Sequence, residues 1–126
     1  MNKSNLIFLV VLFLTACTKE VFIIEEPEKP KQNNSPGDFT IEVLKITDTS
    51  IELSWSKAVD PESENVIYEV AVNDSVIGYD ISYTYYNITG LNPGKKYKIE
   101  VIASDNNYNV YKKQIIIETY KSFFDS

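Results

Sequence analysis

Acidic side chains gather in two polar segments of this 126-residue chain, and they are its best candidates for chemistry. Asp60, Glu62 and Glu64 lie in the first segment, and Asp105 is near the start of the second, which runs from Ser104 to Asn109. Ca²⁺ prefers about six to eight oxygen ligands of this kind, from carboxylates and amide carbonyls. Two carboxylates can also act as acid and base on a glycosidic bond. The residue types therefore admit a calcium site or a glycosidase pair.

Neither kind of chemistry follows from the spacing. No stretch fits the calcium loop of an EF-hand, and polar tips of this kind are typical of solvated turns. A glycosidase also needs a cleft that holds the sugar between its carboxylates, which a single domain of this size does not offer. The sequence therefore predicts no catalytic residue and no metal site. Calcium at Asp60, Glu62, Glu64 and Asp105 remains the alternative.

The composition excludes most other kinds of catalytic and metal-binding site. The chain has no His, no Arg and a single Cys at position 17. It therefore lacks an imidazole base, a Ser/His or Cys/His pair, a histidine zinc site and an internal disulfide. A formal net charge of −6 disfavours contact with a nucleic-acid backbone. The sequence predicts a protein that is not an enzyme, needs no cofactor and binds no nucleic acid.

Nine tyrosines are many for so small a chain, and not all of them can be core residues. If Tyr86 and Ile88 face inward, alternation turns Tyr83 and Tyr85 outward, with Tyr79 shortly before them. Exposed aromatic rings can stack on sugars or anchor a protein interface, so these three form a possible ligand face. The alternative is that outward tyrosines simply suit a pleated strand.

The side chains described above must be positioned by short segments in which apolar residues recur at every second position. These segments are rich in Ile, Val, Thr and Tyr, and turn signals separate them. The segments cover residues 40–46, 50–55, 66–72, 84–88, 97–103 and 115–119. No helical stripe of useful length appears. Regular short strands of this kind predict a β-sandwich.

Several strand and turn segments together match the pattern of a known family. They are Ser50-Ile51-Glu52-Leu53-Ser54-Trp55, Asp60-Pro61-Glu62, Tyr68-Glu69-Val70-Ala71-Val72, residues 86–97 and Ala103-Ser104-Asp105. The most specific part is Leu91-x-Pro93-x-x-x-Tyr97, whose spacing fits a tyrosine corner. These residues resemble fibronectin type III over residues 37–119.

The resemblance implies an all-β, immunoglobulin-like sandwich of seven strands. It places Trp55 in the core between the sheets, and it brings the loops of Asp60 and Asp105 to the same end. Strand alternation then assigns the inward faces. The predicted core residues are Ile41, Ile46, Ile51, Leu53, Trp55, Tyr68, Val70, Val72, Tyr86, Ile88, Leu91, Tyr97, Ile99, Val101, Ile115 and Ile117.

Residues 1–16 are predicted to be a signal peptide rather than part of the fold. Lys3 precedes the apolar run Leu6–Leu14, which falls short of the ~20 residues that a membrane-spanning helix needs. The next residues, Leu14-Thr15-Ala16-Cys17, resemble the lipobox of bacterial lipoproteins. The resemblance implies that Cys17 becomes an acylated mature N-terminus. An ordinary signal peptide or an uncleaved anchor is the alternative.

Residues 17–36 are predicted to be a disordered, flexible linker. Within residues 25–36 the prolines are the only apolar residues, so this stretch cannot bury enough surface to fold. Residues 37–119 form the predicted domain, and residues 120–126 form a C-terminal tail. Thr18 follows the cysteine, so the aspartate that resembles the inner-membrane retention signal of enteric bacteria is missing. This favours the outer membrane of a Gram-negative bacterium.

Together these patterns predict a lipid-anchored, non-catalytic binding or presentation module of the bacterial cell envelope. Its expected partners are membrane lipid, through acylated Cys17, and a glycan or an envelope protein. The alternative is a passive spacer or a small subunit of a larger outer-membrane complex. Asp74-Ser75-Val76 also resembles the acceptor of a bacterial O-glycosylation system, although a plain turn accounts for it as well.

Overall fold

The computed structural model describes residues 23–28, 30, 32–62 and 64–124. It divides into two units, Met1–Pro30 and Lys31–Ser126. Residues 23–28 and 30 of the first unit are exposed and have no regular secondary structure. The predicted signal peptide and Cys17 lie outside the described residues. Within the ranges given above, no helix is long and apolar enough to cross a membrane.

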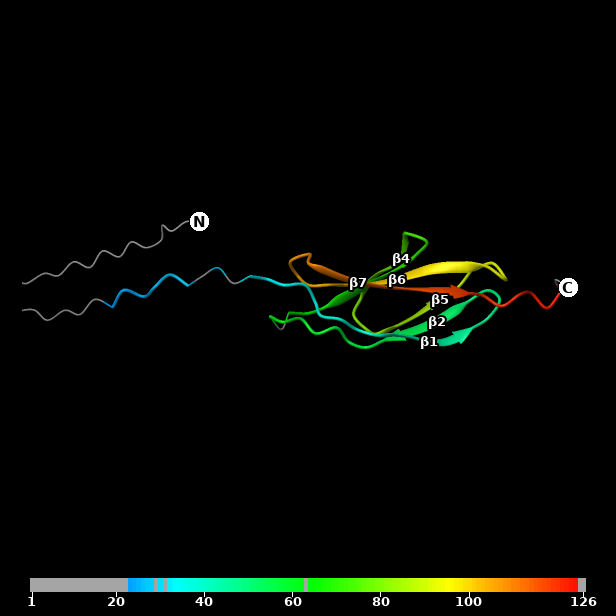
Figure 1. Cartoon of the computed structure of the whole chain (residues 1–126), viewed down its shortest axis with the longest axis horizontal. Coiled ribbons are helices and arrows are strands. Elements are labelled where there is room, and N and C mark those ends of the chain that lie inside the picture. The colour runs from blue at the N-terminus through cyan, green and yellow to red at the C-terminus, as the bar shows by residue number, and fades with distance from the viewer. Residues whose placement is uncertain (1–22, 29, 31, 63, 125–126) are drawn as a thin grey trace, which may run out of the picture. The chain divides into compact units, whose positions relative to one another are not determined.

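The second unit is a sandwich of two antiparallel sheets (Figure 1). In the described part of the chain the strands are β1 (Ile41–Ile46), β2 (Ile51–Trp55), β3 (Ile67–Val72), β4 (Ser75–Ile81), β5 (Tyr85–Ile88), β6 (Lys96–Ser104) and β7 (Val110–Glu118). One sheet has the order β1-β2-β5, and the other has the order β4-β3-β6-β7. The predicted all-β sandwich of seven strands is therefore confirmed.

The sequence pattern missed β4 and the first half of β7. β4 pairs with β3 through two register shifts and contains Gly78 and also Asp80, whose φ is +52°. Both residue types are rare in strands, and bulges break the alternation on which the prediction rested. β7 is an edge strand, so its first half can expose polar side chains such as Lys112 and Gln114. The predicted turn near Asn73 is a tight hairpin between β3 and β4.

The core lies between the two sheets. Every predicted core residue is either buried or packed partly buried against the buried cluster. The pattern missed Phe39, Ala58, Ile81 and Ala103, which also belong to the cluster. Phe39 lies just before β1 and Ala58 just after β2, where no alternation marks them as inward.

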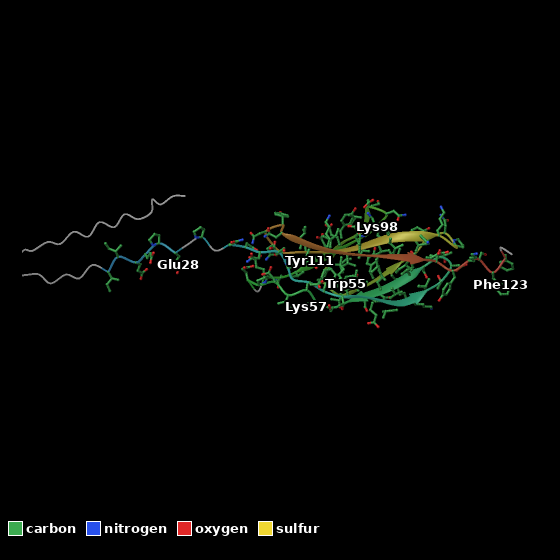
Figure 2. The ribbon with its side chains drawn as sticks, in the orientation of Figure 1. Glu28, Trp55, Lys57, Lys98, Tyr111 and Phe123 are labelled. Atoms are coloured by element: carbon green, nitrogen blue, oxygen red, sulfur yellow. The ribbon has the colours of Figure 1, made fainter. Side chains whose placement is uncertain are left out.

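Tyr68 connects the core to the loop that follows β2. Its side chain is 1% exposed, and its ring centroid lies 5.4 Å from that of Trp55 and 6.1 Å from that of Phe39, both at edge-on angles. Figure 2 shows Trp55 between the two layers of strands. The Tyr68 hydroxyl accepts a hydrogen bond of 2.8 Å from the backbone N–H of Ala58. The core therefore holds the start of the segment that carries Asp60.

Candidate functional site

Three segments meet at the end of the sandwich where the chain enters. They are the leading segment (residues 32–40), the β2–β3 loop (residues 56–66) and the β6–β7 loop (residues 105–109), all at the left of the sandwich in Figure 1. The Asn33 amide donates to Glu64 Oε1 at 3.2 Å and accepts from the Asn109 amide at 3.2 Å. The Asn107 amide nitrogen lies 3.0 Å from both Glu64 carboxylate oxygens. Hydrogen bonds thus join all three segments.

Asp60 and Asp105 close their own loops in the same way. Asp60 Oδ1 accepts the backbone N–H groups of Glu62 at 2.8 Å and Glu64 at 3.1 Å. Asp105 Oδ1 accepts those of Asn107 at 2.7 Å and Asn109 at 2.9 Å. The side-chain oxygen of each aspartate thus takes the place of a backbone carbonyl as the acceptor of these N–H groups. Local sequence therefore sets the shape of both loops.

Both aspartates are buried, at 4% exposure for Asp60 and 3% for Asp105. Burial raises the pKa of Asp105, but hydrogen bonds from the Asn109 side chain and from the backbones of Asn109 and Asn107 outweigh it, so the pKa falls below 3.8. Asp105 is therefore ionised at neutral pH. Asp60 Oδ2, in contrast, is buried and has no hydrogen-bond partner among the residues that the structure describes.

The structure brings together three of the four acidic residues singled out from the sequence. One carboxylate oxygen from each of Asp60, Glu64 and Asp105 lies within 4.8 Å of the others. Glu62 is directed elsewhere, because its carboxylate accepts the Asn34 side-chain amide at 2.8 Å. Asn34 and Asn33 were missed as partners, since no local signal links the leading segment to loops so distant in sequence.

Among the described residues, no lysine forms an ion pair with this carboxylate cluster (Asp60, Glu64 and Asp105). In the described part of the chain, the ion pairs join Lys98 to Asp74 and Glu100, and Lys113 to Asp38. The groups that contact the cluster are instead backbone N–H groups and asparagine amides. Within the described ranges, this end of the sandwich therefore holds concentrated negative charge with no lysine paired to it.

The three tyrosines of the possible ligand face lie on one stretch of chain. Tyr79 is on β4, Tyr83 in the β4–β5 connection and Tyr85 on β5, with exposures of 65%, 58% and 41%. The Tyr79 hydroxyl donates to the Val76 carbonyl at 3.0 Å, so its ring lies along its own strand. Among the aromatic contacts of the described residues, none joins two of these three rings. They are exposed neighbours in sequence rather than a stacked cluster.

Tyr86 has a different role from its neighbours. Its hydroxyl donates to the Ile77 carbonyl at 3.0 Å, which links β5 of one sheet to β4 of the other. Gly78 makes room for the ring, because a Cβ there would lie 2.7 Å from a Tyr86 ring carbon. This contact ties together the edge strands β4 and β5 of the two sheets.

A corner at the opposite end supports the fold. Leu91 packs partly buried against the core, and the Tyr97 hydroxyl accepts the Asn92 backbone N–H at 2.7 Å. Thr119 then donates to the Asn92 carbonyl at 2.6 Å, and Pro93 lies within the same partly buried turn. The Tyr97 bond ties the β5–β6 connection to β6.

Tyr97→Phe is expected to destabilise the domain by about 1–3 kcal/mol, because it leaves the partly buried Asn92 N–H without its acceptor. Urea denaturation measures the change in the free energy of unfolding. Tyr120→Phe is the matched control, since this ring is exposed. Equal stability of the two variants would show that the corner bond contributes nothing.

Two packed antiparallel sheets and a tyrosine bonded across the β5–β6 corner define an immunoglobulin-like sandwich. The sequence model of the family described as Fibronectin type III domain matches residues 34–119. The chain belongs to this family. A fibronectin type III domain is a generic binding or structural module and is typically not catalytic.

Solved structures agree with this fold. The fibronectin type-III domain of human fibronectin type III domain containing protein 3 superposes with a TM-score of 0.54 at 23% identity, over 81% of this chain and 96% of that one. A Yersinia enterocolitica family 28 exopolygalacturonase superposes with a TM-score of 0.55 at 18% identity, over 71% of this chain. A chitinase from Bacillus thuringiensis superposes with a TM-score of 0.57 at 17% identity, over 75% of this chain.

The matched chains differ greatly in length. This chain spans 21% of the exopolygalacturonase chain and 15% of the chitinase chain, so only a small part of each enzyme is similar to it. No curated protein sequence matches it. At these identities the similarity establishes the fold alone.

Proposed function

We propose that this protein is a lipid-anchored binding or presentation module of the bacterial cell envelope, in the outer membrane of a Gram-negative bacterium. Acylated Cys17 anchors it, residues 17–36 act as a linker, and residues 37–119 are the presented domain. The lipobox-like sequence at residues 14–17 supports the anchor. Membership of a family of generic binding and structural modules supports the non-catalytic role.

The path of the chain through the domain suits presentation. The leading segment enters at the end that carries Asp60 and Asp105. The chain leaves at the other end (Figure 1). There the backbone N–H of Tyr120 donates a hydrogen bond to the Thr47 carbonyl of the β1–β2 turn. An N-terminal anchor therefore leaves the sides of the sandwich and its far end free for a partner.

The observation that carries the binding role is the exposure of Tyr79, Tyr83 and Tyr85 on β4, the β4–β5 connection and β5, which follow one another in the chain. Exposed tyrosines give large contact area at low entropy cost, to a sugar ring or to a protein surface. A glycan or an envelope protein is the proposed partner. The absence of stacking among the described rings favours the second candidate, a passive spacer or small subunit of an outer-membrane complex.

A triple variant with Ser at positions 79, 83 and 85 separates these functions. A soluble form, residues 17–126 with Cys17→Ser, is applied to a glycan array and used in pull-downs from envelope extracts. We expect the wild-type face to retain a ligand and the triple variant to lose at least about tenfold in affinity, as for removal of interface aromatics. Tyr120→Ser is the control for a tyrosine outside the face. A wild-type blank in both assays would favour the spacer.

A further inference from the structure

We propose that Asp60, Glu64 and Asp105 form a Ca²⁺-binding site that joins the β2–β3 and β6–β7 loops at the chain's entrance to the sandwich. One carboxylate oxygen from each residue lies within 4.8 Å of the others, a separation that a single cation with ligand distances of about 2.4 Å can bridge. The residues come from loops that only the folded domain brings together.

The two carboxylate oxygens of Asp60 differ in their partners. Oδ1 accepts the backbone N–H groups of Glu62 and Glu64, whereas Oδ2 is buried and has no partner in the described part of the chain. A buried carboxylate oxygen is costly unless a hydrogen bond or a cation compensates for its lost hydration. Oδ2 is therefore the Asp60 oxygen that remains for a metal ion.

The charge of the cluster also favours a bound cation. Two buried carboxylates and a half-buried one repel one another at this separation. None of the three forms an ion pair within the part of the chain that the structure describes. A divalent cation would compensate most of this charge at once.

The donor set selects Ca²⁺ among the common cations. Every candidate ligand is oxygen, and the chain has no His, which disfavours zinc and the later transition metals. Amides of Asn33, Asn107 and Asn109 surround the carboxylates, and a half-turn of an amide exchanges its nitrogen for an oxygen donor. Ca²⁺ accepts such irregular sets, whereas Mg²⁺ demands near-octahedral geometry and retains water.

Because the site exists only in the folded state, Ca²⁺ should raise the melting temperature. The test uses residues 17–126 with Cys17→Ser, freed of metal with EDTA, and then titrated with CaCl₂ or MgCl₂. We expect a rise of at least about 5 °C at about 10 mM CaCl₂, and a smaller rise with MgCl₂. Isothermal titration calorimetry should give one site with a Kd of about 1 mM or tighter, as in extracellular calcium modules.

Asp60→Asn distinguishes a metal site from a merely structural aspartate. The amide oxygen can still accept the two backbone N–H groups that Oδ1 accepts, but the free carboxylate oxygen is replaced by an uncharged NH₂ group. In EDTA the variant should melt at or above the wild-type temperature, because repulsion within the cluster is relieved. The shift produced by CaCl₂ should disappear.

Asp80→Asn is the matched control, since this exposed residue lies on β4 and its φ of +52° suits Asn. It should retain the full calcium shift. If Asp60→Asn fails to fold, the half-buried Glu64→Gln provides the same comparison. A wild-type protein that gives neither a melting shift nor heat of binding with CaCl₂ overturns the proposal. So does an Asp60→Asn or Glu64→Gln variant that keeps the wild-type shift.

Discussion

Cys17→Ser is expected to abolish acylation of the protein completely. The proposed acyl group is carried by the thiol, and the chain has no second cysteine to replace it. Each buried methylene contributes about 0.8 kcal/mol to membrane binding, and stable anchoring needs more than one chain or signal. Loss of the acylated residue should therefore remove the lipid attachment at position 17.

Metabolic labelling with a fatty-acid analogue, followed by intact mass measurement, tests this anchor. The wild-type protein should carry label and should lack residues 1–16, whereas the variant should carry no label and retain them. Membrane fractionation alone would not decide the question, because an uncleaved apolar run at Leu6–Leu14 can itself hold the precursor at a membrane. Thr18→Ser is a conservative neighbouring control that should remain labelled. Label on the Cys17→Ser protein would refute the proposed attachment point.

Tyr68→Ala is expected to cause the largest loss of stability among the substitutions considered, about 3–5 kcal/mol. Tyr68 is among the largest fully buried side chains, and its ring contacts Trp55 from the opposite sheet and Phe39 from the leading segment. Alanine would leave a cavity where these segments meet. Tyr68→Phe should cost about 1–3 kcal/mol, because it keeps the ring but leaves the buried Ala58 N–H without its acceptor.

Urea denaturation of the soluble form measures both changes, with the slope of the transition as a check on two-state unfolding. Tyr83→Ala is the control, since it removes the same atoms from an exposed position and should change stability by no more than about 0.5 kcal/mol. Similar midpoints for Tyr68→Ala and Tyr83→Ala would show that the aromatic contacts do not hold the sheets together.

The anchor and the calcium site are independent proposals. The linker proposed for residues 17–36 ends in the leading segment, where Asn33 contacts Glu64 and Asn34 contacts Glu62. A cation at the cluster would therefore order the point at which the linker joins the domain. Calcium titration uses protein without lipid, so failure of one proposal leaves the other untouched.

The sequence alone determined the fold class and the inward face of most strands. The alternation of apolar and polar residues correctly predicts that Ile51, Leu53 and the alternating residues of other strands are buried. It does so because successive side chains of a strand point to opposite faces, which is a local property of the backbone. The spacing from Leu91 to Tyr97 likewise pointed to the corner, since its bond joins residues close in sequence. Alternation failed on β4, where bulges and Gly78 interrupt it.

Only the tertiary structure decided which polar residues meet. Asn107 and Glu64 are 43 residues apart and Asn109 and Asn33 are 76 apart, so no local pattern links them. Sheet topology brings their loops to one end, where Glu62 turns to Asn34 and Glu64 joins Asp60 and Asp105. The sequence showed that these loops are acidic. The folded chain decides which carboxylates share a site, because contacts between distant segments depend on how the strands pair.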